Sequence, residues 1–289
     1  MNAVVIKDVT KRFGLKRALQ GINLTVPAGS IYGFLGPNGA GKTTTIRCLM
    51  DFIRPSSGTI EVFGRDSRLE SAAIKRQVGF LSADSQLYLH WSAAQHIGFY
   101  RQARGAAPDA QKLLHQLELP ANVPVKNLSS GNRQKLGFVL ALMHRPQLLV
   151  LDEPTRALDP LLQEEIYELL RRFRAGGGTV FFSSHNLAEV EKLCDEVGII
   201  RQGKMVASES MQAIRDLKVH MVRAVFAKPV ATKELVGAGV QIISSQGNTV
   251  IAKVHGDLTA FMAKVSRHDL SDLEVSRPSL EEVFMEFYR

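Results

Sequence analysis

The sequence contains few cysteines and no long apolar run. Its two cysteines, Cys48 and Cys194, are too few for a disulfide framework and offer no metal-ligand spacing. The longest uninterrupted apolar stretch, 138–143, has six residues, whereas a membrane-spanning helix needs about 20. The N-terminal segment lacks the basic and apolar regions of a secretory signal. We therefore expect a protein of a reducing compartment that does not itself cross a membrane.

The sequence also lacks dense basic clusters, although its net charge is positive. The 36 Lys and Arg residues exceed the 28 Asp and Glu residues and give a formal net charge of +8. No run of adjacent basic residues is longer than two, which is sparser than a nucleic-acid-binding arm. Two interpretations of the excess stay open: attraction to anions, such as nucleotide phosphates or acidic membrane surfaces, and a solvated surface.

Residues 1–209 show apolar segments that alternate with helical periodicity. Strands are predicted at 3–9, 21–26, 30–35, 148–151 and 179–182. Residues 85–145 are expected to be mostly helical, and 160–174 has the apolar spacing of an amphipathic helix that ends at three glycines. The compact apolar run at 148–151 is typical of a parallel strand covered on both faces. Strands that alternate with helices predict an α/β domain with a parallel sheet.

Residues 210–289 predict a second, smaller α+β domain. The expected order is strand, helix, strand, strand, helix, strand, which is ferredoxin-like, with a hairpin turn at 245–248. Ser279 and Glu282 form a capping box that predicts a final helix. The sequence thus predicts two domains, 1–209 and 210–289.

A glycine-rich loop follows the strand predicted at 30–35 and precedes a helix. Residues 36–43 match the pattern G-x4-G-K-[ST]. Such a loop points backbone N–H groups at phosphate oxygens, and the next helix presents its positive end to them. Lys42 would neutralise the β- and γ-phosphates, and the Thr43 hydroxyl suits Mg²⁺. The expected nucleotide contacts are Gly36, Pro37, Asn38, Gly39, Ala40, Gly41, Lys42, Thr43 and Thr44.

Polar side chains also follow two other predicted strands. Asp152 and Glu153 come at the end of the strand 148–151, at the edge where α/β sheets place ligands. Divided roles would explain the pair: Asp152 holds Mg²⁺ through water, and Glu153 accepts a proton from an attacking water. The alternative is an acidic pair that caps a helix. His185 follows the strand 179–182, close to the expected γ-phosphate.

One more motif links these segments to a single protein family. The segment 128–132, LSSGN, lies about twenty residues before Asp152, and Ala157-Leu158-Asp159 follows that carboxylate. With the phosphate loop and Ser184-His185, these motifs make residues 3–209 resemble the ATP-binding cassette family. Within that family the chain is similar to ATPase subunits of bacterial exporters of the daunorubicin-resistance group, whose membrane subunit is a separate polypeptide. The segment 278–284 is similar to the C-terminal extension of that group.

The resemblance implies a fold, partners and residue roles. The fold would be a P-loop NTPase with an antiparallel β subdomain and a helical subdomain. Phe13 would stack on adenine, although a core phenylalanine is the alternative. Ser129 and Gly131 would reach ATP held by an opposite subunit, Asp159 would join the two sites, and His185 would hold the γ-phosphate and the attacking water. The implied assembly is a head-to-tail homodimer or heterodimer, bound to an integral membrane permease at the cytoplasmic face of the membrane.

Some residues depart from the family pattern. After the segment 78–81, VGFL, the family usually has proline and then a glutamine or glutamate that contacts Mg²⁺, whereas this chain has Ser82-Ala83. Asp84 or Gln86 could substitute as a metal contact. Ala83 therefore leaves open a slow regulatory subunit that pairs with a competent one. A second alternative, a cassette ATPase acting on nucleic acid or the ribosome, usually carries paired cassettes or long charged insertions, so no nucleic acid is expected.

Overall fold

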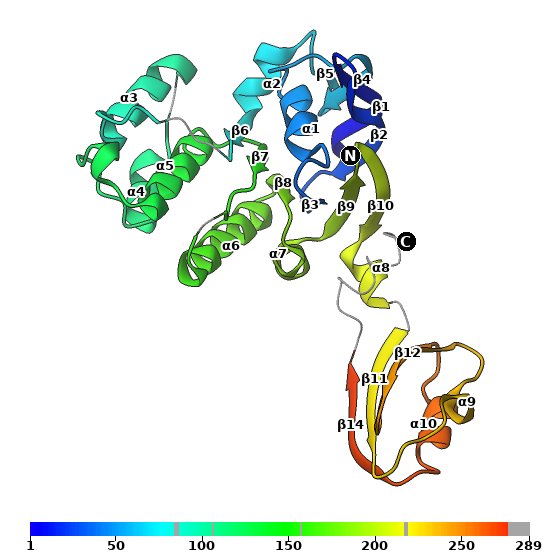
Figure 1. Ribbon diagram of the computed structural model, residues 1–289. Coiled ribbons are helices and arrows are strands. Elements are labelled where there is room, and N and C mark those ends of the chain that lie inside the picture. The colour runs from blue at the N-terminus through cyan, green and yellow to red at the C-terminus, as the bar shows by residue number, and fades with distance from the viewer. Residues whose placement is uncertain (84–86, 106, 157, 217–218, 277–289) are drawn as a thin grey trace. The chain divides into compact units, whose positions relative to one another are not determined.

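The computed structural model (Figure 1) describes the chain except residues 84–86, 106, 157, 217–218 and 277–289. The chain divides into two compact units, Met1–Met211 and Gln212–Arg289. No helix among the described residues is long and apolar enough to span a membrane.

The first unit is built on a six-stranded sheet with the order β10-β9-β3-β8-β7-β6. The strands are β3 (Ile31–Leu35), β6 (Val78–Leu81), β7 (Leu148–Asp152), β8 (Thr179–Ser184), β9 (Glu196–Arg201) and β10 (Lys204–Ser210). All are parallel except β10, which pairs antiparallel with β9. Every residue of β3, β7 and β8 is buried, which confirms the predicted parallel core. The carboxyl ends of these strands meet at one edge of the sheet.

Helices pack against this sheet. They are α1 (Lys42–Leu49), α2 (Ser71–Gln77), α6 (Pro160–Ala175) and α7 (Leu187–Leu193). α1 packs on β7, α6 on β8, and α7 on β3. α6 buries Leu162, Ile166, Leu169 and Leu170, as the apolar spacing predicts. Phe173, also expected to face inward, is half-buried because it lies in the last turn before the helix ends at Gly176.

A second, antiparallel sheet shares the core of the first. Its order is β2-β1-β4-β5, from β1 (Asn2–Phe13), β2 (Lys16–Pro27), β4 (Ser57–Val62) and β5 (Arg65–Asp66). The strands expected at 3–9 and 21–26 are confirmed and are longer than predicted. Val4 and Ile22 of this sheet belong to the same apolar cluster as Phe34 and Phe181 of the parallel sheet. The two sheets therefore fold as one body.

Residues 85–145 form a group of helices, seen on the left of Figure 1. They are α3 (Ala93–Arg104), α4 (Ala110–Gln116) and α5 (Ser130–Leu142), with a 3₁₀ turn at Val125–Asn127. α3 begins with a capping box between Ser92 and Gln95. α3 and α4 both pack against α5, and α5 packs against β6. The expectation of a mostly helical segment is confirmed for its described residues.

The second unit is a four-stranded antiparallel sheet with the order β12-β13-β11-β14. Its elements are β11 (Val219–Phe226), α9 (Thr232–Leu235), β12 (Val240–Gln246), β13 (Thr249–His255), α10 (Thr259–Val265) and β14 (Leu270–Ser276), preceded by α8 (Met211–Asp216). This order of strands and helices is the predicted one. Leu235 of α9 and Phe261 of α10 pack with Val222 and Ala252 of the sheet. The helix predicted from Ser279 lies outside the described residues.

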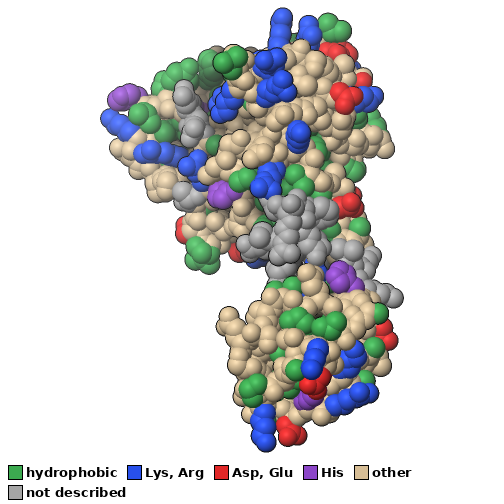
Figure 2. Space-filling view, turned by 45° about the vertical axis from the view of Figure 1, so that its right-hand side comes forward, with side chains coloured by type: hydrophobic (Ala, Val, Ile, Leu, Met, Phe, Trp, Pro, Cys, Tyr) green, Lys and Arg blue, Asp and Glu red, His purple; other side chains and the backbone are tan. Residues whose placement is uncertain are grey.

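The basic excess is spread over the surface. Lys and Arg side chains on the face drawn in Figure 2 stand in several separate places and do not form one continuous stripe. A phosphate-binding pocket needs a few cations at one point, whereas a nucleic-acid track needs a row of them. On this face the distribution is that of a solvated surface.

Gly79 lies at a close approach between the helical segment and the parallel sheet. A Cβ atom at this position of β6 would touch the carbonyl oxygen of Ala141 in α5 and lie 2.6 Å from Cδ2 of Leu149 in β7. Gly79→Ala should therefore lower the free energy of unfolding by about 1–3 kcal/mol through overpacking. Denaturation by urea, followed by the fluorescence of the single tryptophan Trp91, measures this loss.

Gly98→Ala is the matched control. Gly98 lies inside α3, and a Cβ there would have no neighbour within 4 Å. Alanine in a helix should be about 0.5–1 kcal/mol more favourable than glycine. Equal stability of the two variants would contradict the close approach at Gly79.

Candidate active site

The phosphate loop, Gly36–Gly41, connects β3 to α1. Gly41 has a φ of 118° and starts α1 as its N-cap, a conformation that side chains with a Cβ rarely adopt. Gly36 lies against the carbonyl oxygen of Ile200, so that a Cβ would collide with it. The pattern of glycines thus follows from the backbone that the loop must adopt.

Lys42, the first residue of α1, is buried at the centre of the site. Its side chain is 5% exposed, and Nζ donates to the carbonyl oxygens of Gly36 at 2.6 Å and Pro37 at 3.3 Å. Nζ also lies 3.4 Å from Oε1 of Glu153. The loop carbonyls and the carboxylate together offset the cost of burying the ammonium group.

Glu153 joins three segments that are far apart in the sequence. The same Oε1 atom lies 3.3 Å from Nδ1 of His185. The Glu153 backbone N–H donates to Oγ of Ser183 at 3.0 Å, and Oγ of Ser183 donates to Oδ1 of Asp152 at 2.5 Å. Glu153 itself has a φ of 47°, a left-handed conformation that costs about 1–2 kcal/mol for a residue with a Cβ. The structure therefore brings together Lys42, Glu153 and His185, three residues that the sequence analysis selected.

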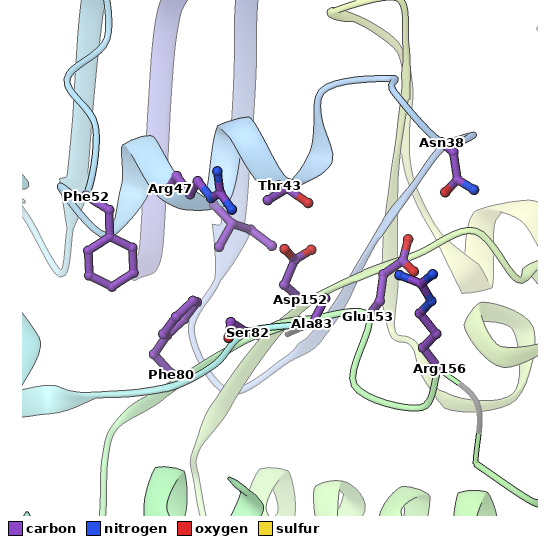
Figure 3. A pocket seen from close by; sticks show the side chains of 11 residues that line it. Asn38, Thr43, Arg47, Phe52, Phe80, Ser82, Ala83, Asp152, Glu153 and Arg156 are labelled. Carbon is purple, nitrogen blue, oxygen red and sulfur yellow. The ribbon is translucent and has the colours of Figure 1, made fainter. Parts of the chain in front are cut away.

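A cavity of about 700 Å³ opens beside these residues (Figure 3). Its lining includes Asn38, Thr43, Arg47, Phe52, Phe80, Ser82, Ala83, Asp152, Glu153 and Arg156. In Figure 3 the Thr43 hydroxyl and the Asp152 carboxylate point toward one another. Asp152 is only 3% exposed, so its charge faces this cavity and Ser183. Two protein oxygen atoms fit Mg²⁺, which takes its other ligands from phosphates and water.

The expected metal contacts after β6 are only partly described. Ala83 lines the cavity but has no oxygen atom in its side chain. Asp84 and Gln86 lie outside the described residues. Among the described residues, no cluster of three histidine, cysteine or acidic side chains could hold a metal by itself.

A second cavity of about 430 Å³ lies along the phosphate loop and shares Asn38, Thr43 and Glu153 with the first. Phe13, at the end of β1, lines it together with seven of the nine residues predicted to contact nucleotide: Pro37, Asn38, Gly39, Gly41, Lys42, Thr43 and Thr44. Phe13 is 49% exposed, which is inconsistent with the alternative of a core phenylalanine. Gly36 and Ala40 do not line either cavity, because Gly36 faces Ile200 and Ala40 belongs to the core. Lys16 and Arg17 also line the cavity, and sequence analysis did not select them.

Ser129, Gly131 and Asp159 stand apart from both cavities. Ser129 is the N-cap of α5 and accepts from the N–H of Asn132 at 3.2 Å. Asp159 is the N-cap of α6 and accepts from the N–H of Leu162 at 2.9 Å. A Cβ at Gly131 would lie 2.7 Å from Cδ2 of Leu162. The starts of α5 and α6 are thus adjacent, but they do not contribute to the phosphate loop's cavities in the same chain.

Two further residues of the site were missed from the sequence. Arg156 lines the cavity of about 700 Å³ and also a smaller one, of about 280 Å³, that contains His185 and Glu189. Glu189 of α7 is 3% exposed. Burial raises the pKa of its carboxyl, and the hydrogen bonds from Ser184 and Thr155, which lower it, offset only part of that effect. Spacing gave no signal for Glu189, because His185 precedes α7, which begins at Leu187, and so does not share a helical face with it.

The chain matches known proteins over most of its length. The family model described as ABC transporter matches residues 19–156. A daunorubicin-resistance ATP-binding protein of Streptomyces coeruleorubidus is 30% identical over 98% of this chain and 95% of its own length. A linearmycin-resistance ATP-binding protein of Bacillus subtilis is 31% identical over 96% of each chain. A bacitracin transport ATP-binding protein of Bacillus licheniformis is 39% identical over 69% of this chain and 67% of its own length.

Solved structures agree on the fold. The ATP-binding subunit of an ABC transporter superposes with a TM-score of 0.69 at 26% identity, over 74% of this chain and 92% of that one. An ATP-binding cassette in its ADP conformation superposes with a TM-score of 0.66 at 22% identity, over 75% of this chain and 94% of that one. These neighbours have the α/β P-loop NTPase fold. With relatives that match it from end to end, the chain belongs to the ATP-binding cassette family, as an ATP-hydrolysing subunit of a transporter.

Proposed function

We propose that this subunit hydrolyses MgATP between two chains arranged head to tail, and that the cycle drives export through a separate membrane permease. The observation that carries the proposal is the position of Glu153. Its Oε1 atom lies between Nζ of Lys42 and Nδ1 of His185, at the end of a buried strand. A carboxylate held there can take a proton from a water molecule that attacks the terminal phosphate.

The chain's own residues would divide the work of hydrolysis. Lys42, the loop N–H groups and the start of α1 bind the β- and γ-phosphates. The Thr43 hydroxyl and the Asp152 carboxylate would hold Mg²⁺, which supplies positive charge to the phosphate oxygens. Glu153 accepts the proton, and His185 orients the water and the γ-phosphate. Ser183 keeps the Glu153 backbone fixed while the proton moves.

The base of the nucleotide would bind at Phe13. The exposed ring lies in the same cavity as the phosphate loop, and Nζ of Lys11 stands 5.0 Å from the centre of the ring. A half-exposed aromatic ring offers a flat apolar surface for adenine to stack on. Lys16 and Arg17 add positive charge beside the phosphates.

The second half of each site would come from another chain. Ser129 and Asp159 are exposed, and the start of α5 is adjacent to the start of α6 through Gly131. These residues are remote from the cavities of their own chain, so a twofold, head-to-tail pair would supply them to the partner's nucleotide. A homodimer and a heterodimer with another cassette subunit both satisfy this geometry.

Export through a membrane protein is supported by the names of the relatives. They are ATP-binding proteins of daunorubicin and linearmycin resistance and of bacitracin and lantibiotic transport. Because these compounds differ widely in chemistry, we assign the choice of cargo to the permease. The subunit itself would lie at the cytoplasmic face of the membrane, bound to that permease.

The second unit would be a ferredoxin-like accessory domain. Its strand order, β12-β13-β11-β14, and its two helices on one face of the sheet support this assignment. None of the residues assigned to nucleotide chemistry lies in it. We propose that residues 210–289 contribute dimer contacts or regulation.

Ala83 favours a second candidate, a regulatory subunit with slow turnover. Its methyl group lines the cavity of Thr43 and Asp152, where the family usually presents an amide or carboxylate. A weaker hold on Mg²⁺ would follow. Sustained ATP turnover by the purified protein alone would decide against this candidate.

Removal of the general base should separate binding from hydrolysis. Glu153→Gln keeps the shape of the side chain but cannot accept the proton, so phosphate release should fall at least about 100-fold. ATP binding should persist, and size-exclusion chromatography with ATP should show a stable dimer. Glu70→Gln, which changes an exposed carboxylate paired with Arg65, is the control. Wild-type turnover by Glu153→Gln would contradict the assignment.

Removal of the buried cation should act on binding. Lys42→Ala deletes the positive charge that faces the phosphates, so the affinity for ATP should fall at least about 10-fold. Titration with a fluorescent ATP analogue measures it. Lys204→Ala, on the exposed edge strand β10, should bind like the wild type. An unchanged affinity of Lys42→Ala would show that the phosphates bind elsewhere.

A further inference from the structure

Glu189 carries a buried charge that nucleotide binding does not use. The side chain, in the first turn of α7, is 3% exposed. It forms no ion pair with a lysine or arginine among the described residues. Burial of a carboxylate without such a partner is costly unless strong hydrogen bonds replace water.

Two hydroxyl groups supply these hydrogen bonds. Oγ1 of Thr155 donates to one carboxylate oxygen of Glu189, and Oγ of Ser184 donates to the other at 2.5 Å. The Ser184 oxygen also accepts from the N–H of Asn186 at 2.9 Å, which fixes its orientation. Each carboxylate oxygen therefore has one donor, and each donor comes from a different segment.

The two segments are those that carry the reacting groups. Thr155 lies two residues after Glu153, in the turn that follows β7, and Ser184 ends β8 directly before His185. Glu189 thus connects the turn that carries Glu153 to the end of β8, which precedes His185. We call this connection the clamp. Its two hydrogen bonds constrain the separation of Oε1 of Glu153 and Nδ1 of His185, which is 3.3 Å.

The turn after β7 needs such a constraint. Glu153 has the left-handed φ of 47°, which a free turn would relax. On one side, Nε2 of Gln134 in α5 donates to the carbonyl oxygen of Pro154 at 2.5 Å. On the other side, Glu189 in α7 holds Thr155. Helices from two parts of the unit therefore fix the turn from opposite directions.

We propose that Glu189 is a positioning residue of the hydrolytic site, which holds Glu153 and His185 in register through Thr155 and Ser184. The inference rests on the proposed roles of Glu153 and His185 and extends them to a residue that does not touch the nucleotide. Phosphate binding through Lys42 does not pass through Glu189. Loss of the clamp should therefore lower kcat and leave ATP affinity unchanged.

The test uses the full chain and compares kcat, ATP affinity and thermal midpoint. Thr155→Val removes the hydroxyl and keeps the shape of the side chain, so kcat should fall between about 10- and 100-fold, as expected for misplaced reacting groups. Glu189→Gln has one acceptor oxygen instead of two and should lose kcat in the same range. Affinity for ATP should stay within about twofold of the wild type, since both phosphate cavities are intact.

Two comparisons separate positioning from general stability. Thr155→Ser keeps the hydroxyl and should retain wild-type kcat. The double variant Thr155→Val with Glu189→Gln should be no slower than the slower single variant, because either change alone breaks the connection between Thr155 and Ser184 through residue 189. Glu191→Gln, at an exposed carboxylate of the same helix, is the control and should leave kcat unchanged.

Three results would overturn the proposal. Turnover within twofold of the wild type in both Thr155→Val and Glu189→Gln, with Glu153→Gln inactive, would reduce Glu189 to a structural residue and leave the general base in place. Equal loss of kcat in Thr155→Ser and Thr155→Val would also reject the clamp. Wild-type turnover by Glu153→Gln would overturn both this proposal and the function on which it rests.

Discussion

Charged groups at the carboxyl edge of the parallel sheet must be paired where they are buried. Lys42, Asp152 and Glu189 are each at most 5% exposed. Loop carbonyls and Glu153 hold the lysine, Ser183 holds Asp152, and the hydroxyls of Thr155 and Ser184 hold Glu189. Serine and threonine hydroxyls thus link the acidic side chains, and the end of β8 is tied to the end of β7 at two successive residues.

The residues that we propose to face a second chain also serve two purposes. Ser129 and Asp159 already act as N-caps, each using one oxygen lone pair to accept a backbone N–H. The Ser129 hydroxyl still has its proton to donate, which suits an anionic phosphate oxygen. Asp159 keeps its second carboxylate oxygen as an acceptor, which suits a donor across an interface. One set of side chains can therefore start two helices and complete a neighbouring site.

The sequence was informative where local chemistry determines structure. Three features could be predicted from the sequence: the buried strand β7, the phosphate loop, and the polar residues at the strand ends. Buried strands and phosphate loops tolerate few other residue types, so their sequences are distinctive. Glu189 gave no such indication, since α7 alternates charged and apolar residues like an exposed helix, and its burial depends on packing against β3. β4 and β5 were also missed, because these short strands acquire their structure from pairing, β4 with β1 and β5 with β4. Phe173, expected to face inward, is half-buried with its ring against Gly178.

The left-handed backbone of Glu153 has an evolutionary consequence. A glycine would adopt a φ of 47° without a steric clash of Cβ, so a mutation that relieves the backbone strain is available at this position. That mutation gives an inert protein, since glycine has no carboxylate. Selection for ATP turnover must therefore keep a strained residue at this position. A cassette that no longer needs to hydrolyse ATP should lose the acidic residue here before it loses its glycine-rich loop.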